Sequence, residues 1–122
     1  MSKKMLIVDD EPDILKFFST ALEQNGFIPV IAEDGVEGMK KVIEEKPDLI
    51  LLDIMMPEKG GIKMYSELKK DEGLRSIPVV IVTGIWEGAE MKGHVSVPEP
   101  EGHLQKPVEP NNLIKTIGKI LA

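Results

Sequence analysis

The chain has 122 residues, a length that predicts one domain, spanning residues 1–122, with a hydrophobic core of its own. A net charge of -6 and a pI near 5.0 argue against direct binding to nucleic acid or to an anionic membrane surface. The absence of cysteine excludes disulfides and thiolate metal sites. The apolar runs are too short to span a bilayer, and the N-terminus does not have the pattern of a signal peptide, so we expect a cytoplasmic protein.

Short apolar runs alternate along the chain with segments of helical periodicity. The run at residues 5–8 predicts a first strand, and the acidic residues Asp9, Asp10 and Glu11 follow it directly. Pro12 comes next, and proline is favoured at the first position of a helix. The expected apolar face of this first helix consists of Ile14, Phe17, Phe18, Ala21 and Leu22.

A second strand is expected over residues 27–32, where Pro29 favours the edge of a sheet. Asp34 is placed to cap a second helix. The expected apolar face of that helix consists of Val36, Met39, Val42 and Ile43. Four consecutive aliphatic residues at 49–52 then lead directly to Asp53, and such an unbroken run is typical of a strand buried on both faces.

A third helix is expected to begin at the glycine pair at residues 60–61, and Lys69 and Lys70 near its end are expected to be solvated. A fourth strand over residues 77–82 leads to Thr83. Strands that alternate with helices in this way predict parallel βαβ units with right-handed crossovers.

Glycines and prolines are frequent between residues 84 and 102, so a fourth helix in that stretch is expected to be short or irregular. A brief fifth strand is expected over residues 103–105, and Lys106 follows it. A last helix begins near Pro110. Its expected apolar face consists of Leu113, Ile114, Ile117, Ile120 and Leu121.

Polar residues that can carry chemistry follow the predicted strands. Asp9 and Asp10 end the first strand and Asp53 ends the third, so in a parallel sheet their carboxylates meet at one edge. Clustered like charges repel, and an open, oxygen-rich site of this kind favours Mg²⁺. Thr83 and Lys106 add a hydroxyl and an ammonium that can bind phosphoryl oxygens. Together these groups predict phosphoryl transfer to a carboxylate nucleophile.

Five motifs in this order resemble a response-regulator receiver domain of two-component signalling, over essentially the whole chain. They are Val8-Asp9-Asp10-Glu11-Pro12, Asp48-Leu-Ile-Leu-Leu-Asp53-Ile-Met-Met-Pro57, Gly60-Gly61, Val82-Thr83-Gly84 and Lys106-Pro107. The resemblance implies an α/β, three-layer flavodoxin-like (doubly wound) fold. It also implies a five-stranded parallel sheet in the order 2-1-3-4-5 with about five helices.

The resemblance implies roles for the acidic residues. Asp53 matches the phosphoacceptor, which takes a phosphoryl group from a histidine kinase or a phosphotransfer protein. Asp10 matches a direct ligand of Mg²⁺ and Asp9 a ligand that acts mostly through water. Asp53 itself and the backbone carbonyl of Met55 complete the implied metal ligands.

The resemblance also implies a signalling mechanism. Thr83 matches a hydroxyl that moves to the phosphoryl group on activation, and Lys106 matches a phosphate-binding lysine whose bond to Pro107 is a candidate cis peptide. Phosphorylation then biases a two-state equilibrium that a downstream effector protein detects. His103 occupies the place of the usual aromatic switch residue. Such a domain is not a classical enzyme, although it assists its own phosphorylation and dephosphorylation.

Three other functions compete with this prediction. A phosphatase of the haloacid dehalogenase type needs a second aspartate two residues after its nucleophile, and Met55 stands there. A flavodoxin-like cofactor binder needs a phosphate loop after the first strand, where residues 9–11 would repel a phosphate. A receiver-like interaction domain that works without phosphorylation stays open. Purely structural roles stay open as well, with Asp9 and Asp10 starting a helix and Asp53 capping a turn.

Overall fold

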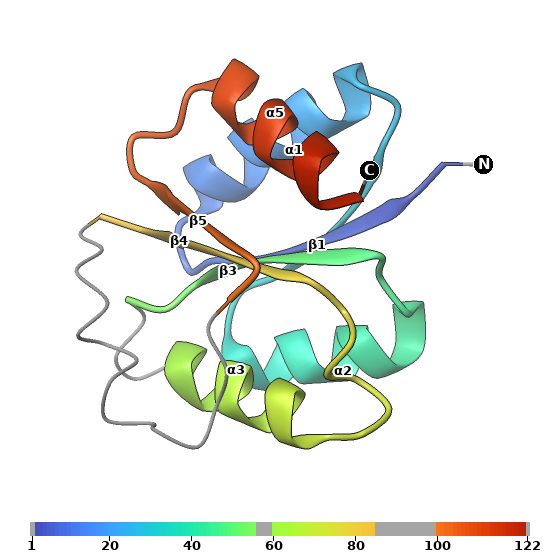
Figure 1. Ribbon diagram of the computed structural model, residues 1–122. Helices are drawn as coiled ribbons and strands as arrows, with labels where there is room; N and C mark the ends of the chain where they lie inside the picture. The colour runs from blue at the N-terminus through green and yellow to red at the C-terminus, as the bar shows by residue number, and fades with distance from the viewer. Residues whose placement is uncertain (1, 56–59, 85–99, 122) are drawn as a thin grey trace.

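A computed structural model describes residues 2–55, 60–84 and 100–121 and contains a parallel sheet between two layers of helices (Figure 1). The elements in chain order are β1 (Lys4–Val8), α1 (Pro12–Gln24), β2 (Ile28–Ala32), α2 (Gly35–Glu45), β3 (Leu49–Asp53), α3 (Gly61–Lys70), β4 (Val79–Thr83), β5 (Gly102–Gln105) and α5 (Pro110–Leu121). The sheet order is β2-β1-β3-β4-β5 with every pair parallel, which confirms the predicted doubly wound α/β topology. The predicted fourth helix falls within residues 85–99, outside the described residues.

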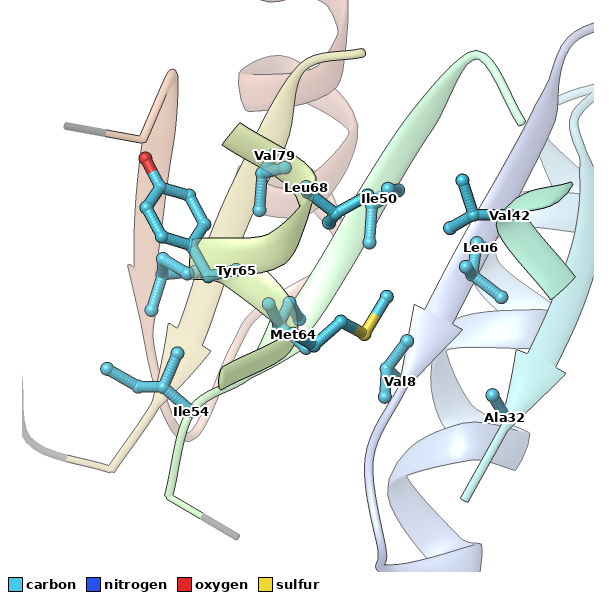
Figure 2. Close-up of a cluster of buried hydrophobic side chains, with 12 residues drawn as sticks. Leu6, Val8, Ala32, Val42, Ile50, Ile54, Met64, Tyr65, Leu68 and Val79 are labelled. Atoms are coloured by element: carbon cyan, nitrogen blue, oxygen red, sulfur yellow. The ribbon is translucent and has the colours of Figure 1, made fainter. Parts of the chain in front are cut away.

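Strands β1, β3 and β4 form the centre of the sheet and are covered on both faces. Every residue of β3 and β4 is buried, as expected for continuous aliphatic strands in a parallel sheet. Alternate side chains enter two separate cores, one beneath α2 and α3 and the other beneath α1 and α5. Figure 2 shows the first of these cores, in which Met64 and Tyr65 of α3 meet aliphatic side chains of the sheet. β2 lies at the edge, as Pro29 predicts.

The predicted helix boundaries have clear local causes. Pro12 lies in the first turn of α1, where its missing N–H is not needed. The Asp34 side chain accepts a hydrogen bond of 2.8 Å from the Glu37 N–H and caps α2 as expected. Gly26, with a φ of 83°, follows the end of α1 and allows the sharp turn into β2. None of the described helices has the length and apolar character needed to cross a membrane.

Two predicted apolar faces differ from the observed ones. Leu15 is buried in α1, whereas Phe17 is 39% exposed. In α2, Val36 is 82% exposed and Ile43 is 65% exposed. The reason lies in the glycines of α2: a Cβ added at Gly38 would lie 2.7 Å from the Met64 sulfur, so this face packs with its backbone against α3. Apolar periodicity alone does not register that contact, because a glycine contributes no hydrophobic side chain.

Strand boundaries shift by a residue or two from the predicted ones. The fourth strand begins at Val79 because residues 77–78 still belong to the turn after α3, and it includes Thr83. The second begins at Ile28, and the fifth begins one residue early, at Gly102. These shifts leave the predicted polar residues at the carboxyl edge of the sheet, where the candidate site lies.

Candidate functional site

Four acidic residues gather at the carboxyl edge of β1 and β3. They are Asp9, Asp10, Glu11 and Asp53. Each contributes one carboxylate oxygen, and these four oxygens all lie within 4.8 Å of one another. The cause is the strand pairing, which places the end of β1 beside the end of β3, with Val8 opposite Leu52. Asp9 and Asp53 are 2% and 3% exposed, whereas Asp10 and Glu11 are exposed. The structure therefore brings together the three predicted carboxylates and adds Glu11.

The two buried carboxylates are oriented by the backbone that follows them. Asp9 Oδ1 accepts a hydrogen bond of 2.9 Å from the Glu11 N–H. Asp53 Oδ1 accepts one of 2.8 Å from the Met55 N–H. Each hydrogen bond closes a local turn of the Asx type. Capping a turn and taking part in the site are therefore compatible in the same side chain. In both residues the other oxygen, Oδ2, is turned toward the same lysine.

Lys106 supplies the positive charge of this cluster. Its Nζ lies 3.0 Å from Asp9 Oδ2 and 3.2 Å from Asp53 Oδ2. A third distance, 3.1 Å, joins Nζ to Glu11 Oε1. The Lys106 N–H also donates a hydrogen bond of 2.7 Å to the Thr83 carbonyl, so the end of β4 fixes the backbone from which the lysine extends. The Lys106–Pro107 bond is cis, which confirms that prediction.

The electrostatics of the cluster reflect one ammonium facing several carboxylates. Burial raises the pKa of Asp9 and the charge of Asp53 adds to this, against the hydrogen bond from the Glu11 backbone and the contact with Lys106. Burial works to lower the pKa of Lys106, but its hydrogen bond to Asp9 and the charges of Asp53 and Asp9 outweigh it and raise that pKa. The lysine is therefore charged at neutral pH, and the cluster keeps a surplus of negative charge.

The raised pKa of Asp9 leads to a prediction about stability. The folded chain binds a proton at Asp9 more tightly than the unfolded chain, so this stabilising contribution is present below pH 3.8 and is lost as the pH rises through the raised value. Asp9→Asn stays neutral, so we expect it to have a higher free energy of unfolding than the wild type at pH 7 in EDTA, but not at pH 3. Urea denaturation at both pH values measures this. Asp13→Asn, at an exposed position, is the control, and an equal gain there would contradict the prediction.

Thr83 lies at the end of β4, beside the strand that carries Asp53. Thr83 is fully buried, and its Oγ1 makes no hydrogen bond to any residue in the described part of the chain. A buried hydroxyl without a partner is uncommon and usually marks a place where a ligand or water completes the structure. Thr83 at the end of β4 pairs with Gln105 at the end of β5. The Thr83 hydroxyl and Lys106, which follows Gln105, therefore lie at the ends of two adjacent strands.

Comparison with known proteins identifies the family. Residues 5–118 match the response regulator receiver domain. The chain belongs to the response regulator receiver family. Protein PilH of Pseudomonas aeruginosa is 36% identical to this receiver domain over 98% of both chains. Polar-differentiation response regulator DivK of Brucella suis is 35% identical, over 99% of this chain and 98% of DivK.

Other relatives are longer than this receiver domain. Phosphate regulon transcriptional regulatory protein PhoB of Escherichia coli is 36% identical over 99% of this chain but 52% of PhoB, so the chain spans about half the length of that relative. Among solved structures, the chemotaxis protein CheY4 of Vibrio cholerae has a TM-score of 0.88 and 26% identity, over 98% of this chain and 99% of that chain. These structural relatives confirm the flavodoxin-like fold.

Receiver domains in general bind Mg²⁺ at an acidic pocket, and the residues of this one suit such an ion. Hard oxygen donors converge, two of them buried, and Lys106, the cation that contacts them among the described residues, leaves part of their charge uncompensated. An arrangement with few protein ligands and exposed carboxylates on one side fits an ion that keeps several of its waters. The donor chemistry therefore fits a small divalent cation.

His103 of this receiver domain lies on β5 opposite Ile81 and is exposed. Its role as a switch stays a prediction. Glu11 was not predicted as a site residue, although it follows the two aspartates directly and contacts Lys106. The sequence places it only in the acidic run after the first strand, and the contact with a lysine 95 residues further along the chain gives it a further role.

Proposed function

We propose that this chain is a phosphoacceptor receiver module of a two-component system or phosphorelay in the cytoplasm. In this proposal Asp53 takes a phosphoryl group from a histidine kinase or a phosphotransfer protein, and the chain signals to a downstream effector protein by a conformational change. One observation carries the proposal: the buried Asp53 carboxylate lies 3.2 Å from Lys106 Nζ in a cluster with surplus negative charge. That combination supplies a nucleophile and a fixed cation for the incoming phosphoryl oxygens.

In the proposed reaction an Asp53 carboxylate oxygen forms a bond to phosphorus while the bond from phosphorus to the donor's nitrogen breaks. The Met55 N–H holds Asp53 Oδ1, so the carboxylate is oriented before the donor arrives. Lys106 stabilises the charge of the transferred group, since its raised pKa keeps it protonated. Mg²⁺ would add charge stabilisation at the same oxygens, with Asp9, Asp10, Asp53 and the Met55 carbonyl as its proposed ligands.

The proposed response involves Thr83. Its buried hydroxyl has no partner among the described residues and can donate a hydrogen bond to a phosphoryl oxygen on Asp53. Such a bond draws the end of β4 toward Asp53 only in the phosphorylated state, which gives the two states different contacts. We propose His103 on the neighbouring strand β5 as the second switch residue. The chain is then a signalling module, not a classical enzyme, that assists its own phosphorylation and dephosphorylation.

Intact-mass measurement tests this function. The purified chain is incubated with acetyl phosphate, with Mg²⁺ or with EDTA, and Asp53→Asn and Asp13→Asn are treated in parallel. We expect one phosphoryl group on the wild type and on Asp13→Asn with Mg²⁺, a large reduction with EDTA, and no adduct on Asp53→Asn. A folded wild-type chain that takes no phosphoryl group would refute the proposal and favour an interaction domain that works without phosphorylation.

A further inference from the structure

Glu11 directly precedes α1, but its side chain makes no hydrogen bond to that helix. Its backbone carbonyl accepts hydrogen bonds of 3.1 Å from the N–H groups of Ile14 and Leu15, as expected of the residue that precedes a helix. Its carboxylate makes no capping hydrogen bond to the first turn. At this position Asp, Asn, Ser and Thr are favoured because their short side chains reach the free N–H groups. The longer side chain of Glu11 instead reaches Lys106, with Oε1 3.1 Å from Nζ.

This contact is the third that surrounds the Lys106 ammonium. A lysine ammonium carries three N–H donors. Three carboxylates face them, those of Asp9, Glu11 and Asp53, at 3.0, 3.1 and 3.2 Å. A phosphoryl group on Asp53 brings further acceptor oxygens to the same ammonium and therefore competes with these three contacts.

Burial decides which of the three contacts is given up most easily. The Asp9 side chain is 2% exposed, so without the lysine its charge would stay buried and poorly compensated. Asp53 carries the phosphoryl group itself. The Glu11 side chain is 59% exposed, so water can replace the lysine there at little cost. Glu11 is thus the partner that Lys106 can exchange.

We propose that Glu11 is a positioning residue that holds Lys106 in the unphosphorylated state and releases it when Asp53 is phosphorylated; this rests on the proposed function. Glu11 then competes with the phosphoryl group for the same ammonium. The Glu11 carboxylate therefore lowers the rate of Asp53 phosphorylation. The hold favours the unphosphorylated state, which keeps the resting signal low.

Two substitutions of Glu11 separate the effect of its contact with Lys106 from the effect of its negative charge. Glu11→Gln removes the charge and weakens the contact with Lys106. Glu11→Asp keeps the charge, but the shorter side chain loses its reach to the lysine and gains the capping hydrogen bond of α1. Asp13→Asn removes an exposed charge from the first turn of the same helix and serves as the matched control. Urea denaturation confirms that each variant is folded.

The first measurement is the second-order rate constant for phosphorylation by acetyl phosphate at saturating Mg²⁺. We expect about a two- to fivefold increase in Glu11→Gln and Glu11→Asp, the size expected when one exposed charged contact is lost. Asp13→Asn should have the wild-type rate constant. If Asp13→Asn rises as much as Glu11→Gln, or if Glu11→Asp keeps the wild-type rate constant, the effect is one of general charge and the proposal is wrong. A decrease in both Glu11 variants would make Glu11 a helper of the reaction and would also overturn it.

The second measurement does not require phosphorylation. Nitrogen-15 NMR of the lysine ammonium groups reports the hydrogen bonding of Lys106 directly, with the assignment made from Lys106→Arg. We expect the Lys106 signal of the unphosphorylated chain to move in both Glu11 variants and to stay in place in Asp13→Asn. An unmoved signal in Glu11→Gln refutes the hold. A wild type that takes no phosphoryl group refutes the proposed function separately, whatever this signal does.

Discussion

Lys69→Ala is expected to lower the free energy of unfolding by about 3 kcal/mol, a typical loss when buried polar groups are left without their hydrogen-bond partner. The Lys69 side chain is 1% exposed, although it lies in the last turn of α3, where the sequence predicts a solvated lysine. That prediction is wrong. Its Nζ donates to the carbonyls of Arg75 and Ile77 at 3.3 and 3.2 Å and to both carboxylate oxygens of Glu101 at 3.0 and 3.2 Å.

The same ion pair connects three separate parts of the chain. Lys69 belongs to α3, the two carbonyls belong to the turn before β4, and Glu101 directly precedes β5. Glu101 Oε1 also accepts a hydrogen bond of 2.7 Å from the Val79 N–H at the start of β4. Without the lysine, two carbonyls lose their donor inside the protein, which is the main reason for the large expected loss.

Urea denaturation of three variants tests this explanation. Lys70→Ala changes the neighbouring exposed lysine and should alter the free energy of unfolding by less than about 0.5 kcal/mol. Lys69→Met keeps apolar bulk near the Tyr65 ring, whose centroid lies 5.8 Å from Nζ, but it donates no hydrogen bond. We expect most of the loss to persist in Lys69→Met. A methionine variant as stable as the wild type would show that packing, not the buried charge, stabilises this corner.

Gly61→Ala is expected to destabilise the chain by about 3 kcal/mol, at the upper end of the range for overpacked positions, and to impair phosphorylation of Asp53. Gly61 begins α3 directly above the end of β3. A Cβ added there would lie 2.5 Å from the Asp53 carbonyl oxygen and 2.9 Å from the Ile54 Cα. Both are backbone atoms, so the conflict can be relieved only if α3 or the segment that orients Asp53 moves.

Two other glycines provide matched controls for this prediction. A Cβ at Gly38 meets the sulfur and terminal methyl of Met64 at 2.7 and 2.9 Å, the far end of a flexible side chain that can turn away. Gly38→Ala should therefore be less destabilising than Gly61→Ala. A Cβ at Gly118 in α5 has no atom within 4 Å among those described, and Gly118→Ala should stabilise the helix by about 0.5–1 kcal/mol. Urea denaturation gives the order, and intact mass after acetyl phosphate treatment gives the effect on Asp53. An unaffected Gly61→Ala variant would contradict the backbone conflict.

Much of the fold and site could be predicted from the sequence because the relevant signals are local. Four aliphatic residues before Asp53 indicate a strand buried on both faces, and alternation with helical segments indicates parallel pairing. Parallel strands place their carboxyl ends at one edge, so Asp9, Asp10 and Asp53 were expected together, and the structure brings them together. Their roles as phosphoacceptor and metal ligands stay predictions.

The wrong predictions came from positions where a distant part of the chain decides the surroundings. Val36 and Ile43 have helical spacing, but glycines of α2 turn that helix so that its backbone faces α3 and these two side chains face solvent. Lys69 has the charge and position of a surface residue, but two carbonyls and Glu101, all beyond its own helix, surround it. Neither environment can be recognised from apolar spacing or from charge alone.

The sequence by itself determined the order of the elements, the fold class and the edge of the sheet where the polar residues meet, because each depends on periodicity and on strand direction. Only the tertiary structure decided that the Lys106 ammonium lies between Asp9, Glu11 and Asp53. These contacts, of 3.0 to 3.2 Å, join residues that are far apart in the chain. The physical reason is that hydrogen bonds and ion pairs act over short range, so their partners are set by packing and not by the spacing of residues along the sequence.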